Sequence, residues 1–192
     1  LSVYAGLRPL VRSGKTHKTA TLSRDHQILV SASGLITITG GKWTTYRKMA
    51  EDVVNQAERV GHLKQLSCHT QTLQIHGWTQ DAIPESNLSL YGSDAAEIQT
   101  LIDQNPDLGK PLHPQLEFQQ VEVIWQIRNE MARQVEDVLA RRTRSLFLNA
   151  RASIECATVV AQLMAQELNY GQDWIEQQVS DYSAVAEGYL YA

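Results

Sequence analysis

The alternation of hydrophobic and polar residues predicts short strands near the start of the chain. Residues 35–39 alternate apolar residues with threonine, which is typical of a short strand. Residues 19–22 and 26–31 have the same character, so the three segments predict an antiparallel meander. Residues 1–7 are also predicted to form a strand that ends before Pro9.

A long amphipathic helix is predicted directly after the last strand. Apolar residues recur at helical spacing over residues 43–60, and charged or amide residues occupy the opposite face. Thr44 or Thr45 can cap its first turn, and Gly61 marks its end.

Beyond this helix the pattern weakens into a linker and then becomes helical. The linker contains glycine and proline, with one short strand at most over residues 72–75, and we place a domain boundary near residues 66–78. The alternation over residues 117–130 also fits a strand, but we favour a helix because no glycine or proline interrupts the flanks. The helices are predicted over residues 94–104, 117–130, 136–142, 150–168 and 173–189.

Together these elements predict an α+β fold with two domains. A small antiparallel strand meander and a long helix form the first, over residues 1–66. An all-α helical C-terminal domain follows over residues 67–192, with short turns that are typical of a small bundle.

Composition and charge exclude several classes of function. The net charge is −4 with both signs interspersed, which argues against binding to nucleic acid. Two cysteines, Cys68 and Cys156, make no disulfide framework and indicate idle thiols. His62, His69 and His76 recur every seven residues without other ligand-like neighbours, so no metal site is predicted.

The turn between the last strand and the long helix is the strongest candidate for binding. Gly40 and Gly41 would expose backbone N–H groups at a helix start, and Lys42 adds a cation beside them. This arrangement suits an anion or an electron-rich ligand, although a simple turn with a solvated lysine also fits. A P-loop is excluded, because Ile36 stands where its first glycine belongs and Trp43 follows the lysine.

Arginine residues supply the other candidates. Arg8 and Arg24 lie near strand ends, where guanidinium groups bind phosphate or carboxylate or form surface ion pairs. A later basic cluster is either a set of solvated ion pairs with Glu130, Glu136, Asp137 and Glu155 or a docking surface for another domain or a membrane. The cluster comprises Arg128, Arg133, Arg141, Arg142, Arg144 and Arg151. Three tryptophans are predicted core anchors: Trp78, Trp125 and Trp174.

Three motifs in order resemble the end of the catalytic region of FAD-dependent glycerol-3-phosphate dehydrogenases: AGLRPL (residues 5–10), SRDH (23–26), and GLI (34–36) leading to GGKWTTYR (40–47). The later half resembles the helical C-terminal domain of that family through EMAR (130–133) and VEDVLARRTR (135–144). The resemblance spans nearly the whole chain. It implies that the chain is a fragment, and that the FAD-binding fingerprint of the parent lies upstream.

The resemblance also implies roles for particular residues. Arg8 and Arg24 would line the substrate pocket, with Arg24 on the phosphate of glycerol 3-phosphate and Arg8 near the flavin and the hydroxyl end. The pyrimidine side of the flavin would lie against Gly40, Gly41, Lys42, Trp43, Thr44 and Thr45. The parent would oxidise sn-glycerol 3-phosphate to dihydroxyacetone phosphate, with hydride passing to FAD and electrons to a quinone or to oxygen. The general base would lie upstream, and the fragment alone would be inactive and would bind FAD poorly.

Two alternatives remain open at this stage. The parent could be another FAD-dependent amine or amino-acid oxidase, or the helical half could be an interaction module for a partner or a membrane. The expected location is the cytoplasm, with a peripheral position on the inner membrane face and a homodimer left open.

Overall fold

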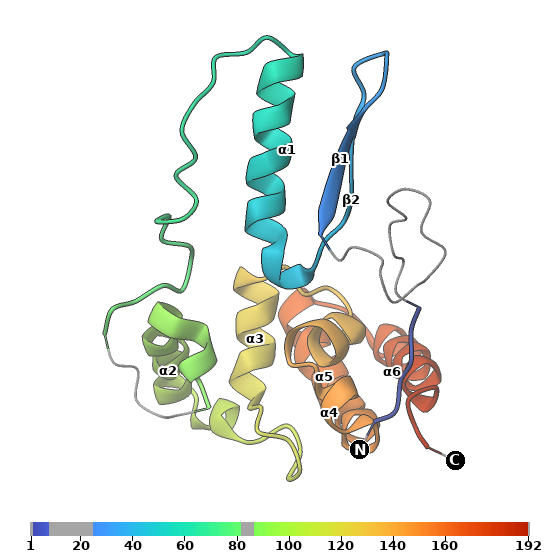
Figure 1. The fold of residues 1–192 in the computed structure, drawn as a ribbon. Coiled ribbons are helices and arrows are strands. Elements are labelled where there is room, and N and C mark those ends of the chain that lie inside the picture. Colours follow the sequence, from blue (N-terminus) through green and yellow to red (C-terminus); the bar gives the residue numbers. More distant parts are fainter. Residues whose placement is uncertain (1, 8–24, 82–86, 192) are drawn as a thin grey trace. The chain divides into compact units, whose positions relative to one another are not determined.

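The computed structural model describes residues 2–7, 25–81 and 87–191, and their contacts divide the chain into two compact units. The first, which we call the hairpin unit, is Gly6–Gln74. The second, which we call the helical unit, consists of Leu1–Ala5 and Ile75–Ala192. Figure 1 labels the helices and strands of both units.

The hairpin unit contains one antiparallel strand pair. Strand β1 (His26–Val30) pairs with β2 (Ile36–Gly40), so that Ile28 lies opposite Ile38. These strands confirm two of the predicted three; the third, over residues 19–22, lies outside the described residues. The strand predicted over residues 1–7 is wrong for residues 2–7, which have no regular secondary structure. Ser2 and Val3 bond instead to Leu146, Ala150 and Tyr189.

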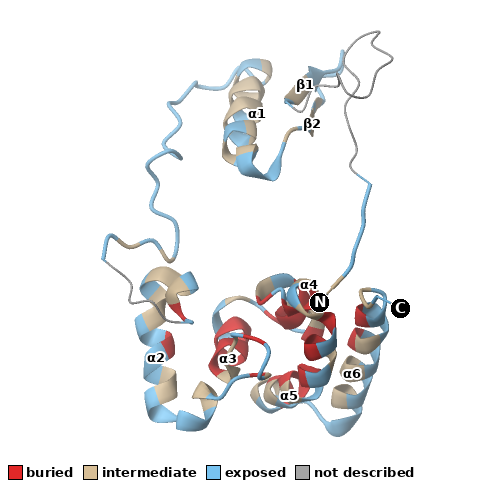
Figure 2. Cartoon of the chain, turned by 60° about the horizontal axis from the view of Figure 1, so that its bottom comes forward, coloured by how far each residue is buried: buried red, intermediate tan, exposed pale blue. Residues whose placement is uncertain are grey.

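The predicted long helix is confirmed. It begins with a 3₁₀ turn, η2 (Trp43–Thr45), continues as α1 (Tyr46–Val60) and ends at Gly61. A salt bridge of 3.0 Å between His26 and Asp52 ties β1 to α1. None of the described residues 25–74 is buried, so these elements enclose no core of their own (Figure 2).

The helical unit follows the predicted order of helices closely. The helices predicted over residues 94–104, 117–130, 150–168 and 173–189 are confirmed by α2, α3, α5 and α6. The helix predicted over residues 136–142 is present as a π-helix, η5, and the short helix α4 was not predicted. The strand predicted over residues 72–75 is wrong, because these residues are irregular. The elements are η3 (Ser89–Asp94), α2 (Ala95–Gln104), η4 (Pro106–Gly109), α3 (Gln120–Asn129), η5 (Asp137–Arg142), α4 (Ser145–Leu148), α5 (Ala150–Leu168) and α6 (Gln172–Glu187).

Helix α5 is the centre of the main hydrophobic core. It packs against α3, α4 and α6, and its buried face consists largely of small residues, which let neighbouring helices approach closely (Figures 1 and 2). Asn149 caps the helix by accepting a hydrogen bond from the backbone N–H of Ala152 at 3.2 Å. The buried residues are Ala150, Ala152, Ser153, Cys156, Ala157, Val160, Ala161, Met164 and Ala165.

A second, smaller core joins α2 to α3. Trp125 is buried there among Leu88, Ile98 and Val121, as an anchor should be. Trp174 is half-buried against the main core, whereas Trp78 is 45% exposed, so the anchor prediction is wrong for Trp78. Its segment lies on the surface of the helical unit, held by backbone contacts rather than by burial of its ring.

Two glycines make the closest backbone contact in that surface segment. Gly92 lies at φ 59° and ψ −126°, and a Cβ atom built on it would be 1.8 Å from the carbonyl oxygen of Gly77. Only glycine adopts this region readily. The neighbouring N–H of Ser93 donates to the Gly77 carbonyl at 3.0 Å, so the two segments are held together at this point.

We therefore expect Gly92→Ala to lower the free energy of unfolding of the helical unit by about 2 kcal/mol or more, through strain and a backbone clash. Urea denaturation followed by circular dichroism measures the change. Gly171→Ala is the matched control, because a Cβ there meets nothing within 4 Å, and it should change stability by less than about 0.5 kcal/mol. Equal effects of the two substitutions would contradict this account.

Candidate functional site

Residues 40–45, which we call the glycine corner, connect β2 to α1. Gly40 and Gly41 both have φ of +79°, a left-handed conformation that favours glycine. Lys42 returns to extended backbone, with φ −138° and ψ 155°, and the 3₁₀ turn starts at Trp43. The predicted strand, glycine turn and helix start are therefore all present.

Gly41 is also required by packing within the hairpin unit. A Cβ atom at this position would lie 2.4 Å from the sulfur of Met49 on α1 and 3.3 Å from the Cβ of His26 on β1. The absence of a side chain thus lets the corner close onto the helix that it starts. This contact gives Gly41 a structural reason to be glycine that does not involve a ligand.

The side chains of Lys42, Trp43 and Thr44 are exposed. The Trp43 ring is 88% exposed and lies against Tyr46, with 5.9 Å between ring centroids. A lysine beside the first N–H groups of a helix makes this corner locally positive. The corner can therefore attract an anion or stabilise negative charge on a planar ligand.

The hydroxyl of Thr45 makes its hydrogen bonds within the glycine corner. It donates to the Lys42 carbonyl at 3.0 Å and lies 3.2 Å from the Lys42 backbone nitrogen, whose N–H donates to it. Thr45 is the N-cap residue of α1 but makes no side-chain capping bond to that helix. The exposed hydroxyl of Thr44 is the better placed of the two for a ligand.

The two predicted substrate arginines, Arg8 and Arg24, lie outside the described residues. Their roles therefore stay predictions. The same holds for their relation to the glycine corner.

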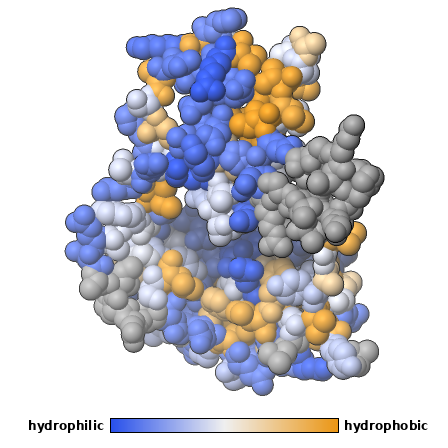
Figure 3. Space-filling model, viewed as in Figure 1, coloured by the Kyte–Doolittle hydropathy of each residue, from blue (hydrophilic) through white to orange (hydrophobic). Residues whose placement is uncertain are grey.

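The hairpin unit also displays an apolar surface. Leu29, Val30 and Leu35 of the hairpin and Val54 of α1 are each more than 40% exposed, and Figure 3 shows hydrophobic atoms gathered on the hairpin. An isolated two-stranded hairpin is at best marginally stable in water. This surface is thus suited to further polypeptide that would cover it.

In the basic cluster, the ion-pair interpretation holds for three arginines. Ion pairs near the surface contribute little to stability. Glu155 pairs with His113 at 2.9 Å rather than with an arginine. The pairs are Arg141 with Glu136 at 2.7 Å and Asp137 at 3.0 Å, Arg142 with Glu130 at 3.5 Å, and Arg128 with Glu167 at 2.5 Å.

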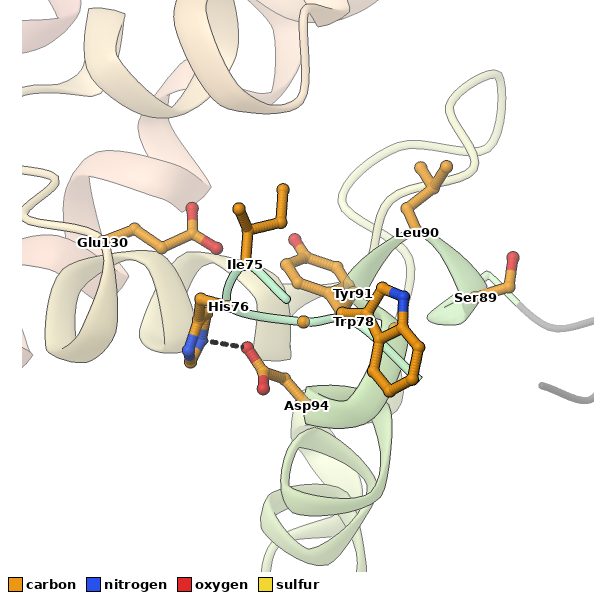
Figure 4. Close-up of a pocket in the computed structure, with 10 residues that line it drawn as sticks. Ile75, His76, Trp78, Ser89, Leu90, Tyr91, Asp94 and Glu130 are labelled. Atoms are coloured by element: carbon orange, nitrogen blue, oxygen red, sulfur yellow. Dashed lines mark ion pairs between the residues drawn. The ribbon is translucent and has the colours of Figure 1, made fainter. Parts of the chain in front are cut away.

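A pocket of about 410 Å³ lies in the helical unit, between residues 75–78 and η3 (Figure 4). His76 and Asp94 form an ion pair of 2.6 Å on its wall, and the carboxyl group of Glu130 also lines it. Two carboxyl groups disfavour a phosphate ligand here. The pocket therefore does not suit a sugar or polyol phosphate.

A buried polar network beside this pocket was not predicted from the sequence. Glu122 on α3 is 1% exposed, and its carboxyl group accepts hydrogen bonds from the Gln119 N–H at 2.6 Å and the Tyr91 hydroxyl at 3.0 Å. Burial raises its pKa to about 7. Residues 121–127 of α3 are all buried, so helical periodicity gave no signal that separates Glu122 from an exposed polar residue.

The described residues hold no group of three or more His, Cys, Asp or Glu side chains suited to a metal ion. Both cysteines are free thiols: Cys68 is exposed, and burial raises the pKa of Cys156 to about 12. No helix in the described ranges is long and apolar enough to span a bilayer.

Comparison of the sequence with known protein families assigns this chain, with its α+β fold, to one of them. The family described as the C-terminal domain of alpha-glycerophosphate oxidase matches residues 32–175. The chain belongs to this family, as the resemblance in its motifs predicted.

Curated relatives match over most or all of the chain. The "Glycerol-3-phosphate dehydrogenase, mitochondrial" of Mesocricetus auratus is 36% identical over 211 aligned residues, covering 100% of this chain and 28% of the relative. The Homo sapiens protein of the same name is 35% identical with the same coverage. "Glycerol-3-phosphate dehydrogenase SDP6, mitochondrial" of Arabidopsis thaliana is 35% identical and covers 87% of this chain and 31% of the relative.

The chain thus spans less than a third of the length of these relatives. The expectation of a cytoplasmic location is wrong, because the names of the relatives specify mitochondria.

The raised pKa of Glu122 predicts a pH-dependent stability. The carboxyl group holds its proton more tightly in the folded state than in the unfolded state, where the pKa is near 4.5. The helical unit should therefore lose up to about 3 kcal/mol of unfolding free energy as pH rises from about 4.5 to 7. Urea denaturation across this range measures the slope.

Glu122→Gln should flatten that slope, because the amide accepts from Gln119 and donates to the Tyr91 oxygen without titrating. Glu117→Gln, at an exposed position five residues before Glu122, is the matched control and should leave the slope unchanged. An unchanged slope in Glu122→Gln would show that another group, such as Glu130, whose pKa burial also raises, causes the pH dependence.

Proposed function

We propose that this chain is the C-terminal part of an FAD-dependent glycerol-3-phosphate dehydrogenase. The parent oxidises the C2 hydroxyl of sn-glycerol 3-phosphate to dihydroxyacetone phosphate and passes the electrons on to a quinone. The observation that carries the proposal is the exposed, cationic glycine corner within a chain of this family. The names of the relatives support the substrate, and they favour a mitochondrial location for the parent.

The glycine corner is proposed to face the pyrimidine edge of the flavin. A bound flavin supplies hydride acceptance at N5, and reduction places negative charge near N1 and O2. Lys42 and the first N–H groups of the helix would stabilise that charge, since they are already oriented before the reaction. The exposed side chain of Thr44 can make an additional hydrogen bond, whereas the hydroxyl of Thr45 is already bonded to the Lys42 carbonyl.

The residues present fit such a ligand in three respects. Lys42 is exposed, the helix start is accessible, and the Trp43 ring offers a flat apolar surface beside them. The donors are a cation and amide groups, which suit an electron-rich ring rather than a metal ion.

The two arginines are proposed to bind the substrate. Arg24 would pair with the phosphate through the fork of its guanidinium, and Arg8 would lie near the hydroxyl that is oxidised. The general base is proposed to lie in a part of the parent beyond this chain. The exposed apolar surface of the hairpin unit supports this division, because it suits additional strands of a larger flavin-binding domain.

Substitution of Arg24 tests the substrate. In the parent enzyme, Arg24→Ala should raise KM for glycerol 3-phosphate about tenfold or more, because a charge-assisted bond to phosphate is lost. Steady-state kinetics with glycerol as a second substrate should show no comparable loss for the molecule without phosphate. Arg151→Ala, at an exposed position of the helical unit, is the control. An equal change for both substrates would contradict a contact between Arg24 and the phosphate, whereas a wild-type parent that does not oxidise glycerol 3-phosphate would favour an amine oxidase.

Substitution of Lys42 tests the flavin contact. Lys42→Met should lower the two-electron reduction potential of the bound flavin by about 30 mV or more, which is a tenfold loss of preference for the reduced form. Lys42→Arg keeps the charge and should stay near the wild-type potential. Redox titration against reference dyes measures both. Lys48→Met on α1 controls for the loss of a lysine, and an equal shift in that variant would argue against a specific contact.

A further inference from the structure

An exposed tryptophan lines the pocket between residues 75–78 and η3, and packing does not explain its position (Figure 4). Trp78 is 45% exposed and belongs to neither of the two hydrophobic cores formed by the described residues. The Tyr91 side chain lines the same pocket. Its hydroxyl donates to Glu122 at 3.0 Å and accepts from Gln126 at 3.1 Å, so this ring is held in place before any ligand binds.

Asp94 brings a largely buried negative charge to the pocket. Its side chain is 15% exposed, whereas that of its ion-pair partner His76, at 2.6 Å, is 85% exposed. His76 supplies a positive charge only while its ring is protonated, and a neutral ring leaves the charge of the carboxylate uncompensated within this pair. A largely buried carboxylate in this situation is stabilised by a further cation beside it.

Glu130, at the end of α3, brings a second carboxyl group to the same pocket. The guanidinium of Arg142 lies 3.5 Å from this carboxyl group and also donates to the backbone carbonyls of Asp137 and Glu130, so its charge is shared among three acceptors. Burial raises the pKa of Glu130, and the charge of Asp94 raises it further. The two carboxyl groups are therefore close enough to repel each other, and a cation between them would relieve that repulsion.

The chemistry of the walls narrows the class of ligand. Two carboxyl groups disfavour an anion, and the described residues include no group of three His, Cys, Asp or Glu side chains suited to a metal ion. Ile75, Trp78 and Leu90 also offer exposed apolar surface that methyl or methylene groups can cover. An ammonium ion that carries such groups suits both the charge and the apolar walls, and the faces of aromatic rings attract it. The volume of about 410 Å³ is typical of sites for small ligands.

We propose that this pocket binds a small organic ammonium ion, with Trp78 and Tyr91 against its methyl or methylene groups and with Asp94 and Glu130 facing its charge. The inference is independent of the proposed function, because it concerns a binding site whose walls all belong to the helical unit.

Choline and its neutral isostere 3,3-dimethyl-1-butanol test the requirement for charge, because the two molecules have nearly the same shape. Choline should bind to the parent protein saturably, with a Kd of about 1 mM, and the isostere should bind at least about tenfold more weakly. Butylammonium, which carries N–H donors for the carboxylates, is a second probe and should bind in the same range. Titrations followed by saturation-transfer NMR measure all three affinities, because the method detects weak binding to a large protein.

Two substitutions test the location of the site. Trp78→Ala removes an aromatic wall and Asp94→Asn removes a charge, and each should weaken choline binding about fivefold or more. Trp78→Phe keeps a ring and should bind choline more tightly than Trp78→Ala does. The matched controls are Tyr170→Ala, at an aromatic residue that is 46% exposed outside the pocket, and Asp103→Asn, at an exposed position of α2. Both controls should leave the Kd for choline unchanged.

Four results would overturn the proposal. Neither choline nor butylammonium binds saturably, or the neutral isostere binds as tightly as choline, which would make the pocket merely apolar. Unchanged affinity in both Trp78→Ala and Asp94→Asn would place the choline site elsewhere. Binding of Nα-acetyl-lysine amide that is tighter than that of choline and is lost in both variants would assign the pocket to a lysine side chain of another protein. A parent that does not oxidise glycerol 3-phosphate overturns the proposed function and leaves this inference standing.

Discussion

The close packing of small side chains along α5 is the constraint on which the helical unit depends. Alanine, serine and cysteine on its buried face let α3 and α6 approach the helix backbone, and Tyr182 of α6 bonds to Ser153 across that contact. Interiors packed to this density tolerate little change in volume. The caps at the start of α5, from Asn149 and from Ser2, hold the helix in the register that this packing needs.

The hairpin unit has no comparable constraint of its own. Its strands and α1 are held by one strand pair, the His26–Asp52 salt bridge and the close contact of Gly41 with Met49, and none of its described residues is buried. The residues proposed to contact flavin therefore lie in the unit that has fewer buried contacts to stabilise it.

Charge is used differently in the two units. Lys42 of the glycine corner is exposed, where it can contact a ligand. Glu122, whose pKa burial raises, is instead buried in a hydrogen-bond network with Tyr91 and Gln126. A perturbed pKa often marks a functional site. Here the network joins α3 to η3, and the raised pKa follows from burial rather than from catalytic use.

The sequence by itself determined the elements whose signals are local: the strands β1 and β2, the glycine turn, the end of α1 at Gly61 and the extent of α5. Turn conformation, helix periodicity and capping act over a few residues, so they can be recognised without a partner. The motifs in residues 5–10, 23–26 and 34–47, with those in residues 130–144, likewise predicted the family.

Only the tertiary structure decided which residues are buried and what distant segments do. Residues 2–7 have a strand-like composition but form no strand, and the bonds of Ser2 and Val3 go to α4, α5 and Tyr189. Trp78 is exposed and Glu122 is buried, against the usual behaviour of both residue types. Burial and long-range hydrogen bonds depend on partners that are distant in the sequence. The partners of Ser2, for example, lie more than a hundred residues away, and no local pattern encodes them.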